Sequence, residues 1–526
     1  MEQREAQYEQ EDELHAATAV VVHRPGLEVF LGSLHPAGSL FECSAGADTA
    51  RAAHENFVRG LRACGVAHCF ALPDVLAAAP RAELEALAME AVTYELCADD
   101  AGRAPEDAAA AAAEAALLAD AYKRETLAAK SAAELVAMVL TAPTVVLRRM
   151  RGGAASGNAL AVERVALHPV SNLVFLRDQQ IVTARGLVIG ALKEPQRRRE
   201  NALLRRAFAL LGVPAMGHVS RNDAPGARAV ATLEGGDYLA APRGLAFLGV
   251  GLRTSDAAAA QLLGRGLLGV PRLAVVRDDG DRQQKRMHLD TVFNIVDERH
   301  CTVWEWAITR KPLQRVVALY ECDHAGMDLV RAGRCPMCGA ADPALRAAYA
   351  QLRCPRCARP YSECECEFVP CGEGDDEKTV GRLPERVGTY RLVRAGVELT
   401  EFLAGEGYTV IPVTEEEQTD YMVNYLNLGR MPRADGTAGP VRLLSVHSGL
   451  AQKLRDAGVS ADDVAVEDVD YRGITRMYGA AHCSSQVFRC PDPARYAEYA
   501  ALFDDAQRRI DAVRQQNAQL EKGLLY

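Results

Sequence analysis

Hydrophobic and polar positions alternate along this chain with two periods, which predicts short strands interleaved with amphipathic helices. Near the N-terminus TAVVVHRPG predicts a strand, and VAHCFAL further along predicts another. Between them ADTARAAHENFVRGLRACG predicts a helix, which Gly65 is suited to end. The apolar residues that share one face of this helix are Ala53, Phe57, Leu61 and Cys64.

Residues 73–141 differ in character, because they are rich in Ala, Leu, Glu and Lys, which favour helices. Ser131 is placed to cap the last of these helices, and Glu134 completes the pattern of a capping box. From Thr144 onward strand-like segments recur between helices, and they include NLVFLRD, QIVTARGLVIGA, GDYLAAPRGLAFLGVG, RLAVVRDD, MHLDTVFNIVD, CTVWEWAI and VVALYEC. This mixture predicts the α/β fold class. No sequence repeat is strong enough to define its units.

Composition narrows the class of protein. The chain has 526 residues, of which 49% are hydrophobic and 25% charged, as in ordinary globular proteins. Its formal net charge of −10 disfavours a chain-wide nucleic-acid or anionic-membrane role. No apolar run is long enough to span a membrane, and the Glu- and Gln-rich start does not resemble a targeting peptide. We therefore expect a cytoplasmic protein with no nucleic acid and no membrane among its partners.

Cysteines cluster in one segment. Eight of the 15 cysteines lie between Cys322 and Cys371, and CPMC and CPRC form a CxxC…CxxC pattern. In a long chain without a secretion signal, this pattern predicts a closed structural zinc site with four thiolate ligands. The predicted ligands are Cys335, Cys338, Cys354 and Cys357. Reduced free thiols or disulfides are the alternative. Further possible ligands leave a second zinc open, namely Cys322, His324, Cys364, Cys366 and Cys371.

Five other segments concentrate polar residues among apolar neighbours. They are SNLVFLRD, PQRRRE, LEGGD, MHLDTVF and GAAHCSS. If MHLDTVF is a strand, His288 and Asp290 project from the same face, since side chains two apart in a strand do so. Taken singly, each segment has an ordinary explanation: a core histidine, a loop carboxylate, a solvated basic run or a buried cysteine.

Together and in this order, the segments resemble the arginine deiminases of the guanidine-modifying (pentein) superfamily. Arg197 follows Asp178 by 19 residues and Arg253 follows Asp237 by 16, as in the family pattern. The resemblance extends to VVVHRPGLE and to the Ala-rich helices, and it covers most of residues 18–320 and 380–492. It implies a five-fold pseudosymmetric α/β propeller with a helical insertion. The cysteine-rich insert has no counterpart in the standard family members.

The resemblance also implies a reaction, the hydrolysis of L-arginine to L-citrulline and ammonia. Two carboxylates can hold a planar guanidinium by paired hydrogen bonds, and a thiolate can attack its central carbon. The implied catalytic residues are the nucleophile Cys483, the acid and base His288, its partner Glu234, and the guanidinium-binding pair Asp178 and Asp290. The implied substrate-binding residues are Asn172, Arg197, Arg253 and Asp237. No cofactor is implied for catalysis.

One residue departs from the family pattern. Five residues before Cys483, where the family usually has an arginine, this chain has Tyr478. The departure concerns the end of the site that binds the substrate's α-carboxylate, and it does not touch the thiol chemistry. It leaves open an altered affinity or a preference for a modified arginine.

The predicted organisation has four parts. Residues 1–16 form a mobile acidic tail, 17–320 the first part of the deiminase fold with a helical insertion at about 73–141, 321–375 the zinc insert, and 376–526 the second part with the nucleophile. Alternative functions are amidino transfer, a dihydrolase reaction to ornithine, and a non-catalytic arginine-binding scaffold that presents the zinc insert. The sequence leaves a homo-oligomer open.

Overall fold

The structure is a computed structural model, and it describes residue 10 and residues 12–105, 107–150, 159–221, 230–310, 314–322, 383–433 and 435–523. These residues form a mixed α/β fold, as the hydrophobic pattern predicts. None of the helices within these ranges is both long and apolar enough to cross a membrane.

A three-stranded unit recurs through the fold. In each unit two antiparallel strands are followed by a third strand, which pairs in parallel with the second after a connection that contains a helix. The units are β6–β7–β8, β9–β10–β11, β12–β13–β17, β18–β19–β20 and β21–β1–β2. Five such units agree with the propeller that the resemblance implies, but their arrangement around one axis stays a prediction.

The bounds of the unit strands are β1 (Ala16–Val22), β2 (His68–Ala71), β6 (Gln180–Thr183), β7 (Gly186–Ile189), β8 (Gly217–His218), β9 (Tyr238–Ala241), β10 (Leu245–Val250), β11 (Arg272–Arg277), β12 (Phe293–Ile295), β13 (His300–Trp304), β17 (Thr409–Val413), β18 (Leu426–Pro432), β19 (Ala438–Ser445), β20 (Val464–Asp468) and β21 (Ser485–Cys490). The α-helices that connect them are α1 (Leu27–Ser33), α2 (Ala47–Ala63), α10 (Arg198–Leu210), α11 (Asp256–Gly264), α12 (Glu305–Thr309), α13 (Leu399–Gly405) and α15 (Leu450–Asp456). The chain also has α14 (Glu415–Thr419), α16 (Arg472–Thr475), α17 (Tyr496–Ala501) and α18 (Asp504–Gly523).

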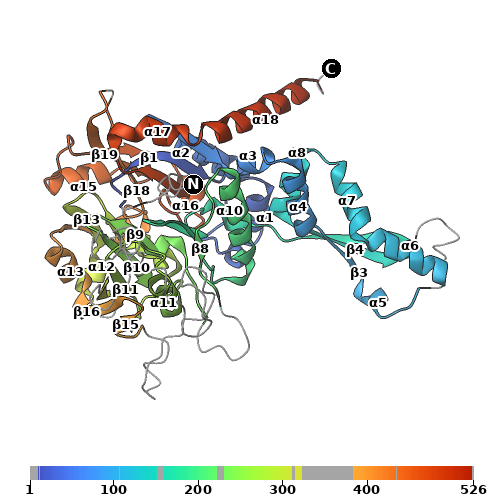
Figure 1. Cartoon of the computed structure of the whole chain (residues 1–526), viewed down its shortest axis with the longest axis horizontal. Helices are drawn as coiled ribbons and strands as arrows, with labels where there is room; N and C mark the ends of the chain where they lie inside the picture. The colour runs from blue at the N-terminus through green and yellow to red at the C-terminus, as the bar shows by residue number, and fades with distance from the viewer. Residues whose placement is uncertain are drawn as a thin grey trace, which may run out of the picture.

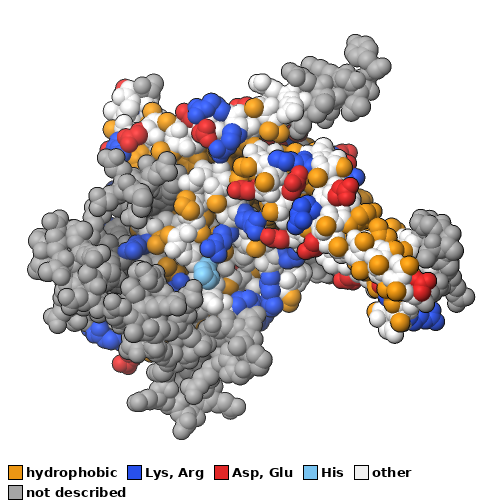
Figure 2. Space-filling view, turned by 45° about the vertical axis from the view of Figure 1, so that its right-hand side comes forward, with side chains coloured by type: hydrophobic (Ala, Val, Ile, Leu, Met, Phe, Trp, Pro, Cys, Tyr) orange, Lys and Arg blue, Asp and Glu red, His pale blue; other side chains and the backbone are white. Residues whose placement is uncertain are grey.

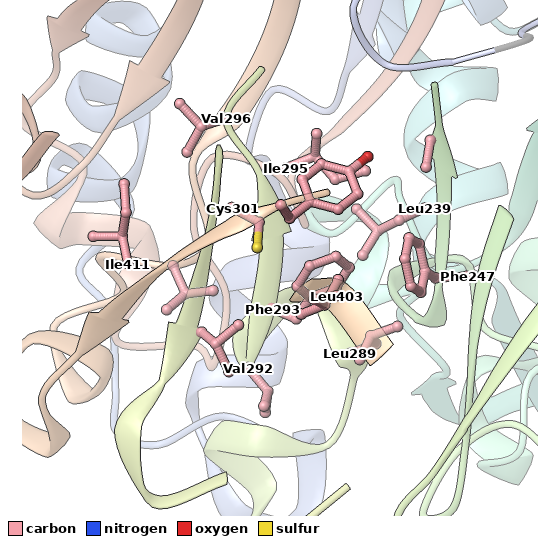
Figure 3. Close-up of a cluster of buried hydrophobic side chains, with 14 of the residues drawn as sticks. Leu239, Phe247, Leu289, Val292, Phe293, Ile295, Val296, Cys301, Leu403 and Ile411 are labelled. Atoms are coloured by element: carbon pink, nitrogen blue, oxygen red, sulfur yellow. The ribbon is translucent and has the colours of Figure 1, made fainter. Parts of the chain in front are cut away.

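Buried side chains join neighbouring units. Phe293 in β12 packs on Phe247 in β10, with ring centroids 4.9 Å apart, inside a large apolar cluster (Figure 3). Asn294 donates from Nδ2 to the carbonyl oxygens of Val423 and Tyr425, both at 2.9 Å, which ties β12 to the segment before β18. These amide bonds satisfy backbone groups that are buried between two sheets.

The second unit, β9–β10–β11, carries the cysteine-rich segment. Its sheet is extended by β14 (Val316–Cys322), β16 (Tyr390–Glu398) and β15 (Arg386–Val387). Cys322 pairs with Tyr390, so the chain leaves and re-enters this sheet at the same end. The four predicted zinc ligands, Cys335, Cys338, Cys354 and Cys357, lie outside the described residues.

The Ala-rich region forms an arm that projects from the units (Figure 1). Its elements are α3 (Leu72–Ala77), α4 (Arg81–Ala91), β3 (Thr93–Leu96), α5 (Ala98–Ala101), α6 (Ala108–Leu118), α7 (Asp120–Ala128), α8 (Ala132–Thr141), β4 (Pro143–Arg149) and β5 (Leu160–Leu167). The capping box of Ser131 and Glu134 is confirmed. Strand β3 is the part of this region that the helix-forming composition did not predict. Hydrophobic side chains gather on the surface of the arm (Figure 2), among them the exposed Val162 and Val165 of β5.

Three sequence-based expectations are wrong in detail. MHLDTVF is not one strand, because Leu289–Thr291 forms the 3₁₀ helix η7 before β12. NLVFLRD likewise contains the 3₁₀ helix η3 (Ser171–Val174) and no strand. Residues 12–16 do not belong to a mobile tail, because Glu13 and Leu14 are buried and β1 begins at Ala16. In each case contacts made by polar side chains, described below, override the local pattern.

Helix α2 has the predicted buried face. Ala53, Phe57 and Leu61 are buried, and Gly65 follows the helix with a positive φ of 94°. The Phe57 ring lies 5.0 Å, centroid to centroid, from that of Tyr471, next to the segment that precedes β21.

We expect Phe57→Ala to lower the free energy of unfolding by about 3–5 kcal/mol, because it removes a fully buried ring and leaves a cavity. Phe30→Ala is the matched control, since that side chain is 44% exposed and should cost less than about 0.5 kcal/mol. Urea denaturation measures both. Equal effects of the two substitutions would contradict this account of α2.

Candidate functional site

Each unit contributes a polar residue from the segment directly before its first strand. Asp178 precedes β6, Asp237 precedes β9, Asp290 precedes β12 and Cys483 precedes β21, each by one to three residues. The remaining unit, β18–β19–β20, contributes Asn424, which precedes β18. The sequence interpretation missed this residue. These five residues are widely separated in sequence, but each occupies the same position in its unit, just before the first strand.

A buried histidine–carboxylate pair lies on one side of the site. His288 Nε2 is 2.8 Å from Glu234 Oε2, and neither side chain is exposed to solvent. The double glycine after Glu234 permits this approach: a Cβ on Gly236 would lie 2.7 Å from His288 Nδ1, and one on Gly235 would collide with the carbonyl of Arg177. Glycine is thus required at both positions by close contact with neighbouring atoms.

The charge state of His288 is set by its neighbours. Burial alone would lower the pKa of His288, but the carboxylates of Asp178, Glu234 and Asp237 outweigh burial and raise this pKa to about 10. Burial would raise the pKa of Glu234, but the hydrogen bond to His288 and the charge of Arg253 hold this pKa below its usual range. At neutral pH the pair is therefore an imidazolium bound to a carboxylate.

Two carboxylates flank the candidate nucleophile, and each has one oxygen engaged and one without a hydrogen-bond partner among the described residues. Asp178 accepts from Arg197 Nη1 at 2.6 Å, and its Oδ1 lies 3.7 Å from His288 Nδ1. Asp290 accepts from His482 Nδ1 at 2.7 Å through Oδ2, and its Oδ1 is unpartnered. Two buried acceptors are thus left available for a cationic donor.

Cys483 lies beside Asp290. Its Sγ is 3.5 Å from Asp290 Oδ2, toward which the thiol donates, and its backbone N–H donates to Asn424 Oδ1 at 3.3 Å. Asn424 also accepts from Ala480 N and donates to the Asp290 carbonyl, so this one amide fixes the nucleophile relative to the carboxylate. Burial, followed by the negative charges of Asp290 and Asp178, raises the pKa of the Cys483 thiol well above its ordinary value of 9.0.

The residue before the nucleophile links Asp290 to the N-terminal segment. His482 lies with Nε2 3.7 Å from Glu13 Oε1, and both side chains are buried. Despite burial, His482 lowers the pKa of Glu13 and also that of Asp290. In the sequence, the only sign that His482 belongs to the site is its position next to Cys483. Nothing in the sequence indicated Glu13.

The predicted substrate-binding arginines are present and already paired. Arg197 bonds Asp178 through Nη1 and Glu200 through Nε and Nη2. Arg253 bonds Glu194 at 3.1 Å and Gln284 at 3.1 Å.

The other two predicted substrate-binding residues border the same region. Asn172 donates from Nδ2 to the Ser39 carbonyl, and its own carbonyl lies 3.4 Å from Arg197 Nη2. Asp237 accepts from Leu289 N through Oδ1, and burial raises the pKa of this carboxyl to about 7.

Three of these groups also have the spacing of a metal site. Ligand atoms of Asp178, Glu234 and His288 lie within 4.8 Å of one another. In this arrangement His288 Nε2 is already bonded to Glu234, and Asp178 is already bonded to Arg197. The prediction that catalysis needs no cofactor is not tested by this geometry.

With this geometry in place, comparisons with known proteins identify the family. A family model described as arginine deiminase matches residues 39–327. The chain belongs to the arginine deiminase family. The match contains eight of the nine predicted site residues, those from Asn172 to Asp290. The ninth, Cys483, lies beyond it, as does Asn424.

Individual family members are distant. The arginine deiminase of Listeria welshimeri serovar 6b is 27% identical over 264 residues, which are 46% of this chain and 59% of that protein. The arginine deiminase of Listeria monocytogenes serotype 4a is 26% identical over 264 residues, 46% and 58% of the two chains. The chain thus matches less than two thirds of the length of these family members.

Solved structures show a weaker likeness. An adduct of dimethylarginine dimethylaminohydrolase with S-methyl-L-thiocitrulline has 12% identity and a TM-score of 0.40, over 90% of this chain and 100% of that one. The N-terminal domain of ArgZ bound to its product, described as an arginine dihydrolase of cyanobacteria, has 13% identity and a TM-score of 0.32, over 65% and 79%. Likeness of this extent carries no conclusion about the chemistry of this chain.

We expect the Cys483 thiol to remain protonated at neutral pH in the free protein, because its pKa is raised well above the ordinary value. The difference in absorbance near 240 nm between wild type and Cys483→Ser, followed from about pH 6 to 10, reports this thiolate alone, since the other cysteines cancel. Asp290→Asn should shift the titration to lower pH, because it removes a neighbouring negative charge. A thiolate band already complete at pH 7 would contradict the assignment.

Proposed function

We propose that this protein hydrolyses the guanidinium group of L-arginine to give L-citrulline and ammonia. The single observation that carries the proposal is the placement of a buried thiol 3.5 Å from Asp290 and between two carboxylates that each have an unpartnered oxygen. Family membership supports the same reaction class.

Binding of the guanidinium uses the free carboxylate oxygens. Asp178 Oδ1 and Asp290 Oδ1 accept N–H groups from the planar cation and fix its plane against Cys483. A buried cation also cancels the two negative charges that raise the thiol pKa, so the Cys483 proton is released to solvent as the substrate binds. The thiolate then forms where it is needed and is not exposed to side reactions beforehand.

The first half of the reaction forms the covalent intermediate. The thiolate sulfur attacks the guanidinium carbon and gives a tetrahedral adduct. His288, an imidazolium at this pH, gives its proton to one terminal amino group. The carbon–nitrogen bond breaks, ammonia leaves, and a cationic thiouronium remains attached to Cys483.

The second half consumes water. His288, now neutral, takes a proton from a water molecule as its oxygen attacks the thiouronium carbon. Collapse of this second adduct breaks the carbon–sulfur bond and returns the thiolate. The hydroxyl proton of the adduct is lost to solvent, which leaves the neutral ureido group of citrulline. Glu234 holds the imidazole in place throughout and stabilises its charged form. In sum, arginine and water become citrulline and ammonium.

The substrate's other end is assigned to Arg197, Arg253, Asn172 and Asp237, following the family. Related outcomes from the same thiouronium are transfer to an acceptor amine and further hydrolysis to ornithine. A scaffold that binds arginine without turnover is the alternative from another class. Products distinguish all of these.

Purified wild-type protein should release citrulline and ammonia from L-arginine in equal amounts, and Cys483→Ala should release neither, because the variant has no nucleophile. Cys490→Ala is the matched control, since this cysteine lies at the other end of β21 and should leave product formation unchanged. Ornithine among the products would favour a dihydrolase, whereas binding without products would favour the scaffold.

We also propose a structural zinc in the segment that contains CPMC and CPRC, with Cys335, Cys338, Cys354 and Cys357 as ligands. Four thiolates form a closed tetrahedral site, so this zinc would stabilise the segment and take no part in the reaction.

Elemental analysis of protein purified without added metal should find about one zinc ion per chain, as expected for one four-thiolate site. Cys335→Ser with Cys338→Ser should lose it, while the control Cys43→Ser should keep it, since Cys43 lies outside the cluster. Unchanged zinc in the double variant would rule out these ligands.

A further inference from the structure

One buried tyrosine beside the nucleophile has no role in the reaction described so far. Tyr421 is 5% exposed, and its hydroxyl group has no hydrogen-bond partner among the described residues. A buried hydroxyl without a partner is costly, so such a group in a native structure calls for a ligand or another explanation. Its backbone adopts a positive φ of 64°, which is unfavourable for a side chain of this size.

The position of Tyr421 is fixed by the same loop that fixes the nucleophile. Asn424 N donates to the Tyr421 carbonyl at 3.0 Å, and the Asn424 side chain in turn holds Cys483 N. Burial, followed by the charges of Cys483, Glu42 and Tyr478, raises the pKa of the Tyr421 hydroxyl well above its ordinary value. Tyr421 therefore belongs to the loop that fixes Cys483, and the charges of Cys483 and Tyr478 act on its hydroxyl.

Two of these groups, Glu42 and Tyr478, are partly exposed to solvent. Glu42 is ion-paired to Lys285 at 2.7 Å, and the two side chains are 36% and 28% exposed. Tyr478 is half-buried, and its φ of 68° is also positive. In the proposed binding mode the guanidinium is held by the buried Asp178 and Asp290, so the tail of the substrate extends toward partly exposed groups such as these.

The arginines predicted to bind the amino-acid head of the substrate are already ion-paired within the protein. Arg197 is already bonded to Asp178 and Glu200, and Arg253 to Glu194. With Tyr478 in place of an arginine, the polar head of an amino acid needs a further hydrogen-bond donor in the site. The phenol of Tyr421 can both donate and accept, so it fits either the carboxylate or the amino group of such a head.

We propose that Tyr421 is a substrate-binding residue of this site and that its hydroxyl group hydrogen-bonds the amino-acid head of the substrate. The inference rests on the proposed function, since it assumes that the guanidinium lies between the two carboxylates. It makes Tyr421 a determinant of which guanidines are accepted, separate from the groups that carry out the chemistry.

The test compares a substrate that has the head with one that lacks it. Tyr421→Phe should lower kcat/KM for L-arginine by roughly tenfold, mainly through KM, as expected for loss of one hydrogen bond to a charged group. For ethylguanidine, which has no amino-acid head, the change should be less than about twofold. A merely structural role would lower both values by the same factor.

Tyr425→Phe is the matched control. Tyr425 lies four residues further along, is fully buried, and its hydroxyl already has a partner in Thr302 at 3.1 Å. This substitution should affect the two substrates equally. Equal losses for L-arginine and ethylguanidine in Tyr421→Phe, or no loss for either, would overturn the proposal while leaving the proposed function intact.

Binding measurements distinguish a failure of the proposed reaction from a failure of the role of Tyr421. If wild-type protein turns over neither compound, the proposed function fails, and calorimetry of L-arginine and ethylguanidine binding decides about Tyr421. Binding of L-arginine weakened roughly tenfold in Tyr421→Phe, with ethylguanidine unaffected, would support it. Unchanged binding of L-arginine, or no binding of L-arginine to wild type, would overturn it.

Discussion

Buried negative charge is the constraint on which the interior of this protein depends. Asp178, Glu234, Asp237 and Asp290 all lie within one site, and none is more than 4% exposed. Removing a carboxylate from water is costly unless it is paired, so each requires a cation or a hydrogen-bond donor. Arg197, His288 and His482 supply most of this compensation. One oxygen of Asp178 and one of Asp290 still have no hydrogen-bond partner among the described residues, which suits the cationic ligand proposed above.

The same constraint explains the local structure around the site. Asp237 accepts from the N–H of Leu289, and Asn424 holds both the Asp290 carbonyl and the Cys483 N–H. These side-chain bonds to backbone groups stabilise short 3₁₀ turns before the strands, in place of the continuous strands that the apolar pattern favours. The polar residues of the site are therefore also what shapes the segments that carry them.

Sequence alone reached the strands and helices whose burial is one-sided. Helix α2, with Phe57 and Leu61 inward, is the example, since periodicity follows directly from burial. Strands β9 and β10 are buried on both faces, and their continuous apolar runs revealed them instead. It did not reach η7 at His288, because three residues of a tight turn have no periodicity. It also missed the recurring units, whose strand pairing repeats without repeated sequence. Among site residues, His288 and Cys483 stand in distinctive strings, whereas Asn424 and Tyr421 stand in YMVNYLNL, which has the composition of ordinary core.

The pairing of β1 with β21 has a consequence for how the protein is made. The hydroxyl of Thr18 in β1 bonds the carbonyl of Phe488 in β21, across 470 positions of the chain. Contacts between such distant segments form late, because a long loop must close first. Since Cys483, the proposed nucleophile, directly precedes β21, a growing chain that has folded its earlier units still lacks this thiol. During translation, the thiol of the candidate site is therefore added after its carboxylates, Asp178, Glu234, Asp237 and Asp290, have been synthesised.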